Sequence, residues 1–264
     1  MSFKDKVVWI TGASSGIGEH LAYAFAEQGA RLALSARKEQ ELARVRQNCP
    51  KGTDILLLPL DITRYDDAAG WAEQVATHFG YINILVNNAG MSQRALVKDA
   101  PFSMDQKLMA VNYLGAVALT KAVLPYMIKQ QFGHIVVVSS VMGKVGTPLR
   151  SAYAASKHAL HGFFDCLRAE VYDENIRVTI LVPGFIRTNL LLNALRPDKP
   201  EYHNLPDSLQ KGIDPGDFAQ KVLRAISAGK QEVFIGGTRE ALAIYLNRFL
   251  PRLFSRIIRK ARVT

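Results

Sequence analysis

The stretch that decides the fold lies near the N-terminus and reads Val7-Val8-Trp9-Ile10-Thr11-Gly12-Ala13-Ser14-Ser15-Gly16-Ile17-Gly18. Its apolar start is typical of a buried strand, and an amphipathic segment at residues 17–28 follows the glycines. Glycines between a strand and a helix allow a tight turn, and they let backbone N–H groups approach a diphosphate at the helix N-terminus. The stretch therefore predicts a strand, a phosphate-binding turn and a helix. A turn without any ligand is the alternative.

Outward from this stretch, short apolar runs alternate with longer amphipathic segments. The predicted strands are residues 6–10, 31–35, 55–58, 82–86, 134–138, 177–182 and 232–235. The predicted helices are residues 17–28, 38–48, 66–79, 103–130, 152–173 and 215–228. This alternation indicates a single doubly wound α/β domain, with a parallel sheet of about seven strands and helices on both faces. We expect the domain to span residues 1–238.

The bulk composition excludes several classes of protein. The chain has 264 residues, of which 48% are apolar, and this is enough for a packed core. Two cysteines, Cys49 and Cys166, exclude a disulfide scaffold and a cysteine-based metal site, and they fit a reducing compartment. We find no signal-peptide pattern and no uninterrupted apolar stretch of about 20 residues, the length of a membrane-spanning helix. These features predict a cytoplasmic protein without a bound metal.

The end of the second predicted strand bears on the choice of cofactor. Many NAD-binding proteins carry an acidic residue here, which accepts a hydrogen bond from the adenine-ribose 2′-hydroxyl. This chain reads Leu34-Ser35-Ala36-Arg37 instead. A guanidinium can bind a 2′-phosphate through several donors, so we expect NADP(H) rather than NAD(H). The alternative is that Arg37 is simply a solvated residue at the start of a helix.

Two further strand ends carry polar or small residues that suit a nucleotide. Asp61 and Ile62 follow the third predicted strand, and the Asp61 carboxylate can accept a hydrogen bond from the adenine amine or cap a helix. The fourth strand ends Asn87-Asn88-Ala89-Gly90. Its amide side chains can hold loop backbones, while Ala89 and Gly90 allow a ribose to approach closely.

The candidate catalytic residues follow the fifth predicted strand, which ends at Ser139-Ser140. Tyr153 comes thirteen residues after Ser140, and Lys157 lies one helical turn beyond it on the same face. A phenol exchanges protons poorly at neutral pH, and a nearby ammonium is expected to lower its pKa. Ser140 can hold the substrate oxygen. A tyrosine and lysine at this spacing are common by chance, so the hypothesis depends on the glycine turn and Ser140 as well.

With these motifs in this order, residues 4–236 resemble the short-chain dehydrogenase/reductase family, in its subgroup of about 250 residues with a Tyr-x-x-x-Lys motif. The resemblance implies a Rossmann-type fold and a catalytic tetrad of Asn112, Ser140, Tyr153 and Lys157. It also implies that Asn112 bends its helix and anchors a water molecule, whereas the alternative is a buried amide that is satisfied locally. In the family, the loop at residues 183–188 contacts the nicotinamide carboxamide through the Ile186 backbone and the Thr188 hydroxyl.

The motifs and the resemblance together place the cofactor on residues from five strand ends. The expected contacts are Thr11, Gly12, Ser14, Ser15, Gly16, Ile17, Gly18, Arg37, Asp61, Ile62, Asn88, Ala89, Gly90, Tyr153, Lys157, Pro183, Gly184, Ile186 and Thr188.

The expected substrate contacts are Ser140, Met142, Tyr153 and Phe185. Further residues expected around the pocket are Ser92, Gln93, Val145, Pro148 and a long lid at residues 190–213 with Leu190, Leu191, Leu192, Leu195 and Leu205. Most of these side chains are apolar, which favours a lipophilic carbonyl or alcohol. The alternative is that the leucines only pack the lid against the body.

The net charge of +10 is concentrated in a C-terminal extension, residues 239–264, which holds seven basic residues and one acidic residue. Apolar residues recur at helical spacing from Leu242 to Ile258, and Pro251 either kinks this helix or begins a second one. A basic amphipathic helix can lie on an anionic membrane surface, and the alternative is packing within the protein or on a partner subunit. We do not expect nucleic-acid binding, because no nucleic-acid motif accompanies the charge.

These observations lead to one functional hypothesis and one alternative. The hypothesis is an NADP(H)-dependent oxidoreductase that acts on CH–OH groups and interconverts a carbonyl and an alcohol, with Tyr153 as the proton-transfer residue. The alternative is a catalytically idle NADP-binding regulator on the same fold. By resemblance, the long helices at residues 103–130 and 152–173 predict a homodimer or homotetramer.

Overall fold

The computed structural model describes residues 2–190, 193–197 and 212–259. Within them, seven strands form one sheet in the order β3-β2-β1-β4-β5-β6-β7, and all neighbouring strands run parallel. The strands are β1 (Val7–Thr11), β2 (Arg31–Ser35), β3 (Ile55–Leu57), β4 (Ile84–Asn87), β5 (Gly133–Val138), β6 (Ile176–Pro183) and β7 (Glu232–Ile235). The predicted parallel sheet is confirmed.

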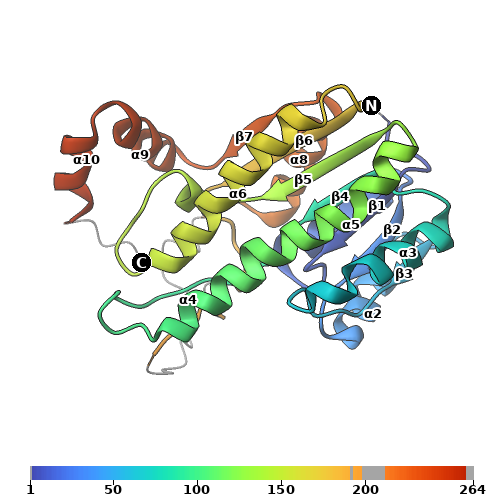
Figure 1. The fold of residues 1–264 in the computed structure, drawn as a ribbon, viewed down its shortest axis with the longest axis horizontal. Coiled ribbons are helices and arrows are strands. Elements are labelled where there is room, and N and C mark those ends of the chain that lie inside the picture. The colour runs from blue at the N-terminus through green and yellow to red at the C-terminus, as the bar shows by residue number, and fades with distance from the viewer. Residues whose placement is uncertain (1, 191–192, 198–211, 260–264) are drawn as a thin grey trace.

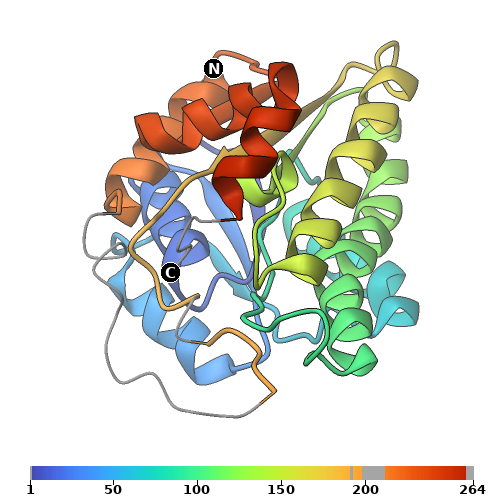
Figure 2. The same ribbon diagram turned by 90° about the vertical axis from the view of Figure 1, so that its left-hand side faces the viewer.

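Helices cover both faces of the sheet (Figures 1 and 2). One face carries α1 (Gly16–Glu27), α2 (Glu39–Asn48) and α8 (Pro215–Ser227). The other face carries α3 (Ala68–Phe79), α5 (Gly115–Lys129) and α6 (Ser151–Glu170). Two single turns complete this layer, η1 (Tyr65–Asp67) before α3 and η3 (Val141–Gly143) after β5.

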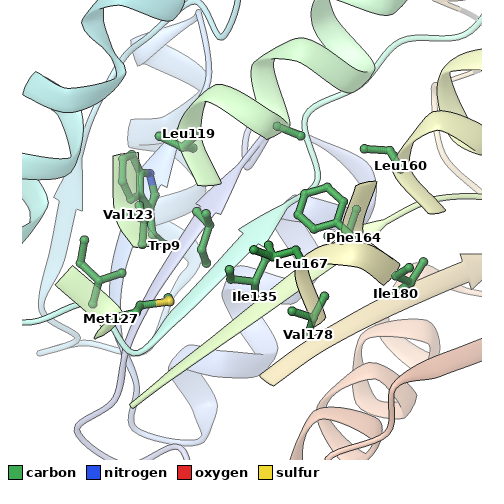
Figure 3. Packing of buried hydrophobic residues seen from close by; sticks show 14 of the residues in the cluster. Trp9, Leu119, Val123, Met127, Ile135, Leu160, Phe164, Leu167, Val178 and Ile180 are labelled. Carbon is green, nitrogen blue, oxygen red and sulfur yellow. The ribbon is translucent and has the colours of Figure 1, made fainter. Parts of the chain in front are cut away.

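The core consists of two apolar layers because successive strand residues point to opposite faces. In β1, Val7 and Trp9 join the layer under α3, α5 and α6, whereas Val8 and Ile10 join the layer under α1, α2 and α8. Figure 3 shows the first layer, where Trp9 lies near Leu119 and Val123. All four β1 residues are fully buried, as strands covered on both faces require.

The strand order reverses between β1 and β4, which are neighbours although β2 and β3 lie between them in the chain. Such a switch point opens a crevice at the carboxyl ends of the strands, where ligands bind in open α/β sheets. The turn after β1 and the loop after β4 flank this crevice. The topology therefore places the candidate site residues at one edge of the sheet.

The helix predicted for residues 103–130 is continuous but not uniform. It consists of α4 (Phe102–Met109), a π-helical segment η2 (Ala110–Leu114) and α5. By length and composition this helix could span a membrane, with a mean hydropathy of 1.4 over its most apolar window. The apolar-stretch criterion did not detect it, because charged residues such as Asp105, Lys107 and Lys121 interrupt the run. Its residues Leu108, Leu119 and Val123 are fully buried in the protein core, and 39% of the apolar window is buried in all.

The C-terminal extension forms two helices, α9 (Thr238–Phe249) and α10 (Pro251–Ile258). Pro251 occupies the first turn of α10, so it begins a second helix rather than kinking one. In the excursion at residues 190–213, Leu191, Leu192 and Leu205 lie outside the described residues. The described Leu195 bridges to Gln93, and Ile213 bridges to Ile186.

Candidate active site

The glycine turn is locked to the loop after β4 by Thr11 and Asn88. The Thr11 hydroxyl accepts hydrogen bonds from the backbone N–H groups of Asn88 and Ala89, both at 3.0 Å. The Asn88 amide donates to the carbonyl oxygens of Thr11 (2.9 Å) and Gly12 (3.1 Å). The prediction that this amide holds a loop backbone is confirmed. Together these bonds set the width of the crevice at the switch point.

The glycines of the turn are required by conformation and by close approach. Gly12 and Gly16 have φ of +64° and +57°, in the left-handed region that side chains disfavour. A Cβ on Gly12 would lie 2.9 Å from the Ala89 Cα, and one on Gly18 would collide with the Gly12 carbonyl. The turn can therefore lie this close to the neighbouring loop and helix only with glycine at these positions.

The N-terminus of α1 suits an anionic group. Ser15 precedes the helix and is exposed, but its hydroxyl caps none of the first-turn N–H groups of Gly16 and Ile17. Uncapped N–H groups and the positive end of the helix dipole favour a phosphate. Thr188 lies opposite, since a Cβ on Gly16 would be 3.1 Å from its methyl group. The uncapped helix N-terminus and the Thr188 hydroxyl are the groups here that could contact a nucleotide diphosphate.

Arg37 and Asp61 lie at the ends of the next two strands. Arg37 is exposed and forms no ion pair with any described residue. The Asp61 carboxylate accepts hydrogen bonds from the backbone (3.0 Å) and hydroxyl (2.7 Å) of Thr63, and these bonds lower its pKa. The positive charge of Arg37 acts in the same direction. Ile62, next to Asp61, is buried against Gly115 of α5.

The loop after β6 is fixed at both ends. Pro183 pairs with Ile235, and a Cβ on Gly184 would lie 2.8 Å from the Gly236 Cα. Phe185 is half-buried and its N–H donates to the Glu240 carboxylate at 3.3 Å. Ile186 is buried and bridges to Ile213. These contacts fix the start of the loop, whose last residue, Thr188, lies beside Gly16 of the glycine turn.

Tyr153 lies in the first turn of α6, close to Ser140 at the end of β5. Its phenol is enclosed, and burial raises the phenol pKa, while the Ser140 hydroxyl and the positive charge of Arg150 lower it. Burial also lowers the pKa of Lys157 to about 8. The Lys157 ammonium donates to the Val138 carbonyl at 2.8 Å and lies 5.9 Å from the centre of the Tyr153 ring. The arrangement therefore brings a proton donor and a cation together at one strand end.

The expected electrostatic role of Lys157 needs correction. We expected its ammonium to lower the phenol pKa of Tyr153, yet in this structure the net shift is upward. Burial outweighs the Ser140 hydroxyl and the positive charge of Arg150, the groups that lower this pKa. Desolvation penalises the charged form of each group, so it raises the pKa of a phenol and lowers that of an ammonium.

Asn112 occupies the π-helical segment η2 and is almost completely buried. Its amide oxygen accepts from the Met91 N–H at 2.8 Å, and its amide nitrogen donates to the Met91 carbonyl (3.0 Å) and the Ser156 hydroxyl (2.9 Å). A π-turn widens a helix locally and is frequent at functional sites. Asn112 thus joins the loop after β4 to α6, and a Cβ on Gly90 would lie 3.3 Å from its oxygen and 3.6 Å from the Lys157 nitrogen.

Two residues that hold Tyr153 in place were not recognised as such from the sequence. The Gln93 side-chain oxygen accepts from the N–H groups of Ala152 (2.9 Å) and Tyr153 (3.2 Å), so it caps α6. The buried Arg150 guanidinium donates to the Ser92 hydroxyl (2.7 Å) and the Gln93 carbonyl (2.5 Å). Gln93 lies about 60 residues before α6, and no local pattern marks such a distant cap.

The surroundings of Tyr153 are apolar. Tyr153 packs in a small cluster with Ala95, Met104, Leu108 and Ala152, and the half-buried residues at its margin are Met91, Ala100, Met142 and Leu195. Three expected pocket residues do not fit that role, because Ser92, Gln93 and Val145 are buried and packed or hydrogen-bonded elsewhere. Met142 and Phe185 stay half-buried beside the strand ends, as a substrate contact requires.

Comparisons with known proteins agree with this geometry. The family model described as "short chain dehydrogenase" matches residues 6–199. The chain is 41% identical over 262 residues to "Dehydrogenase/reductase SDR family member 7B" of Bos taurus, a match that covers 97% of this chain and 81% of the relative. It is 41% identical over 264 residues to "Dehydrogenase/reductase SDR family protein 7-like" of Drosophila melanogaster, covering 98% of this chain and 81% of that protein.

Solved structures share the fold. A short-chain dehydrogenase/reductase from Burkholderia phymatum in complex with NAD has a TM-score of 0.84 at 24% identity, covering 96% of each chain. A short-chain dehydrogenase from Burkholderia cenocepacia in complex with NADP has a TM-score of 0.81 at 26% identity, covering 98% of this chain and 99% of that one. Because one neighbour holds NAD and the other NADP, the likeness is to nicotinamide-nucleotide folds of both kinds.

Proposed function

The chain belongs to the short-chain dehydrogenase/reductase family, and on that premise we propose that it is an NADP(H)-dependent oxidoreductase that interconverts a lipophilic carbonyl and its alcohol. The observation that carries the proposal is the enclosed Tyr153 phenol at the strand edge, with Ser140, Lys157 and Arg150 around it.

The chain's own residues supply proton transfer and orientation. When bound, the nicotinamide supplies or accepts a hydride at the substrate carbon. The Ser140 hydroxyl holds the substrate oxygen. The Tyr153 phenol gives that oxygen a proton during reduction, and the Tyr153 phenolate takes the alcohol proton during oxidation. The Lys157 ammonium is a hydrogen-bond donor near the phenol, and its lowered pKa of about 8 lets it exchange protons near neutral pH. Asn112 holds the loop that carries Gly90 beside this lysine.

The preference for NADP(H) rests on Arg37. Its guanidinium is exposed just beyond β2, at the position where the adenine-ribose end of the nucleotide is expected. A carboxylate there would repel a 2′-phosphate, whereas a guanidinium binds it through charge-assisted hydrogen bonds. Reduction of the substrate is the proposed direction, with NADPH as the hydride donor.

The lipophilic substrate class rests on the residues around the phenol. Met91, Met142 and Leu195 lie against the cluster that contains Tyr153, and the buried polar groups nearby are already hydrogen-bonded to one another. Thioether and aliphatic side chains favour apolar groups next to the reacting carbonyl. A small polyhydroxylated sugar would leave its hydroxyl groups unpaired there.

The test is a panel of ketones and aldehydes of graded hydrophobicity, with NADPH oxidation followed optically. We expect turnover to rise with chain length, and kcat/KM with NADPH to exceed that with NADH by at least about tenfold. Arg37→Ala should remove most of this preference, while Arg64→Ala, a matched change at an exposed arginine near Asp61, should not. An unchanged preference in Arg37→Ala would overturn the cofactor assignment. Failure to reduce any carbonyl would favour a nucleotide-binding regulator.

The family premise also bears on assembly. The proposal includes a homodimer or homotetramer formed through the long helix α4–α5 and α6, whose surfaces carry exposed apolar residues such as Phe102 and Leu114. Light scattering of the full chain measures the subunit number directly.

A further inference from the structure

The C-terminal helices α9 and α10 present a large apolar surface to solvent. Tyr245 and Phe249 are 64% and 71% exposed, and their rings stack on each other with centres 6.3 Å apart. The other exposed members of this face are Leu242, Leu250, Leu253 and Ile257. Monomeric soluble proteins rarely leave large apolar side chains in such a contiguous group, so the face is expected to be covered by something.

The opposite side of the same helices is part of the core. Phe254 is buried, and Ala243, Leu246 and Ile258 pack against the apolar layer under α6. The exposed face is therefore not a badly packed core segment. The two helices already use one side to hold themselves on the domain, and the second side remains available.

Basic residues border the exposed apolar face. Arg239, Arg248, Arg252, Arg256 and Arg259 are all exposed. None of them forms an ion pair with a residue in the described part of the chain. The single acidic residue of these helices, Glu240, points back to the Phe185 N–H. The face therefore combines apolar groups with uncompensated positive charge.

This combination argues against a second copy of the chain as the occupant. In a twofold-symmetric contact the same surface patch meets itself, so a basic face would meet a second basic face. Like charges brought together in an interface weaken it. An anionic lipid surface suits both the apolar groups and the positive charge of this face. The apolar side chains insert into the lipid interior, while the arginines remain at the headgroups.

We propose that the exposed face of α9 and α10 docks the protein on an anionic lipid surface. The helices are fixed relative to the candidate active site, because Asn247 on α9 donates to the Lys144 carbonyl at 3.0 Å and Glu240 holds the Phe185 N–H. Lys144 follows η3, the turn after Ser140, and Phe185 lies in the loop after β6. The helices themselves therefore lie beside the loops expected to contact substrate, at the same end of the molecule as the strand ends (Figure 1).

The test is co-sedimentation of the full chain with vesicles of phosphatidylcholine alone or of phosphatidylcholine mixed with phosphatidylserine. We expect the wild-type protein to sediment with the mixed vesicles, and to be released by salt that screens the headgroup charge. The double change Arg252→Gln/Arg256→Gln should weaken binding by about 30-fold, which is on the order of fivefold for each arginine. The triple change Phe249→Ser/Leu253→Ser/Ile257→Ser should weaken it by more than about tenfold.

Matched controls keep the test specific. Arg46→Gln/Lys51→Gln removes two exposed charges near β3, at the opposite edge of the sheet, and Val97→Ser/Tyr172→Ser removes two exposed apolar side chains elsewhere. Both should bind mixed vesicles as wild type does, and all variants should keep the wild-type unfolding temperature.

Two results would overturn the proposal. One is wild-type protein that stays in the supernatant with mixed vesicles. The other is a triple variant that binds vesicles normally but changes its subunit number in size-exclusion chromatography, since that result would assign the face to a second copy. The test is independent of the proposed enzyme activity, because vesicle binding is measured without substrate.

Discussion

The guanidinium of Arg150 donates a 2.7 Å hydrogen bond to the hydroxyl of Ser92, and the two residues are 5% and 0% exposed. Among the described residues, no carboxylate pairs with this buried cation, which donates to the neutral oxygens of Ser92 and Gln93. Burial lowers the pKa of Arg150 only to about 10, so it stays charged at neutral pH. A buried charge without a counter-charge is costly, and its position beside the Tyr153 phenol suggests a role in proton transfer.

Arg150→Met should therefore change the pH dependence of turnover. Without the cation, the pKa of Tyr153 rises further above its usual value, because Arg150 is one of the two groups that lower it. In the direction of alcohol oxidation, where the phenolate is needed, the rising limb of the kcat profile should move to higher pH. We expect kcat to fall about tenfold at neutral pH.

The control for this prediction is Arg168→Met, since Arg168 also donates to a backbone carbonyl, that of Val178, but lies away from the site. Arg150→Lys should keep part of the wild-type profile because it retains the charge. A loss of kcat with an unshifted pH profile would assign Arg150 a purely structural role.

Tyr153→Phe should abolish turnover while leaving nucleotide binding intact. The change removes one hydroxyl and keeps the ring that packs with Ala152 and Leu108. General acid–base groups contribute on the order of 10²–10⁴-fold to rate, so we expect a loss in that range. NADPH affinity, measured by fluorescence titration, should change less than about threefold. Turnover within tenfold of wild type would remove Tyr153 from the proton-transfer role.

Local sequence signals were sufficient for the sheet and for the glycine turn. The apolar runs predicted every strand, because parallel strands buried on both faces consist mainly of apolar residues. The predicted bounds of two strands, residues 31–35 and 232–235, match the structure. The other bounds shift by at most two residues, since pairing decides where a strand ends: Asn87 pairs with Val137, and Pro183 pairs with Ile235. The roles of the turn glycines and of Asn88 could be predicted from their residue types and positions. The glycines allow close backbone approach, and the Asn88 amide holds a neighbouring backbone carbonyl.

The parts of the site that depend on distant contacts could not be predicted. Gln93 caps α6 from a loop about 60 residues earlier in the chain, and no periodicity marks a cap of that kind. The π-turn around Asn112 has no hydropathy signature, because its residues continue the apolar pattern of the helix. The upward pKa shift of Tyr153 comes from burial, which depends on the packing of several elements at once.

Asn112→Ala should destabilise the fold as well as the site. Asn112 is almost completely buried and makes three hydrogen bonds, two with the Met91 backbone and one with Ser156. Losing them leaves the Met91 N–H unsatisfied, for a cost of about 2–3 kcal/mol in the free energy of unfolding. Chemical denaturation measures this difference. Ser156→Ala removes only one of the bonds and should cost about 1 kcal/mol, so equal costs in the two variants would contradict the assigned network.

Glu232→Gln should reduce stability in a way that depends on pH. The pKa of the Glu232 carboxyl is lowered from an ordinary 4.5 to about 2. The interaction with His161 lowers it most, and the interaction with Lys144 is the next largest lowering cause. The Lys144 ammonium lies 2.6 Å from the carboxylate and the His161 ring nitrogen 3.4 Å from it. Because the folded-state pKa is depressed, the stabilisation is fully present above about pH 4.5 and is lost as the pH falls toward 2.

The expected size of this effect is modest because 44% of the Glu232 side chain is exposed and solvent screens the ion pairs. We expect wild type to exceed Glu232→Gln by about 1 kcal/mol in the free energy of unfolding at pH 6, and the difference to vanish below about pH 2. Asp165→Gln, a change at a more exposed partner of Arg168, is the control and should alter stability by less than about 0.5 kcal/mol at both pH values. A difference for Glu232→Gln that grew as the pH fell would mean that the carboxylate is destabilising in the folded state, and would contradict the ion-pair assignment.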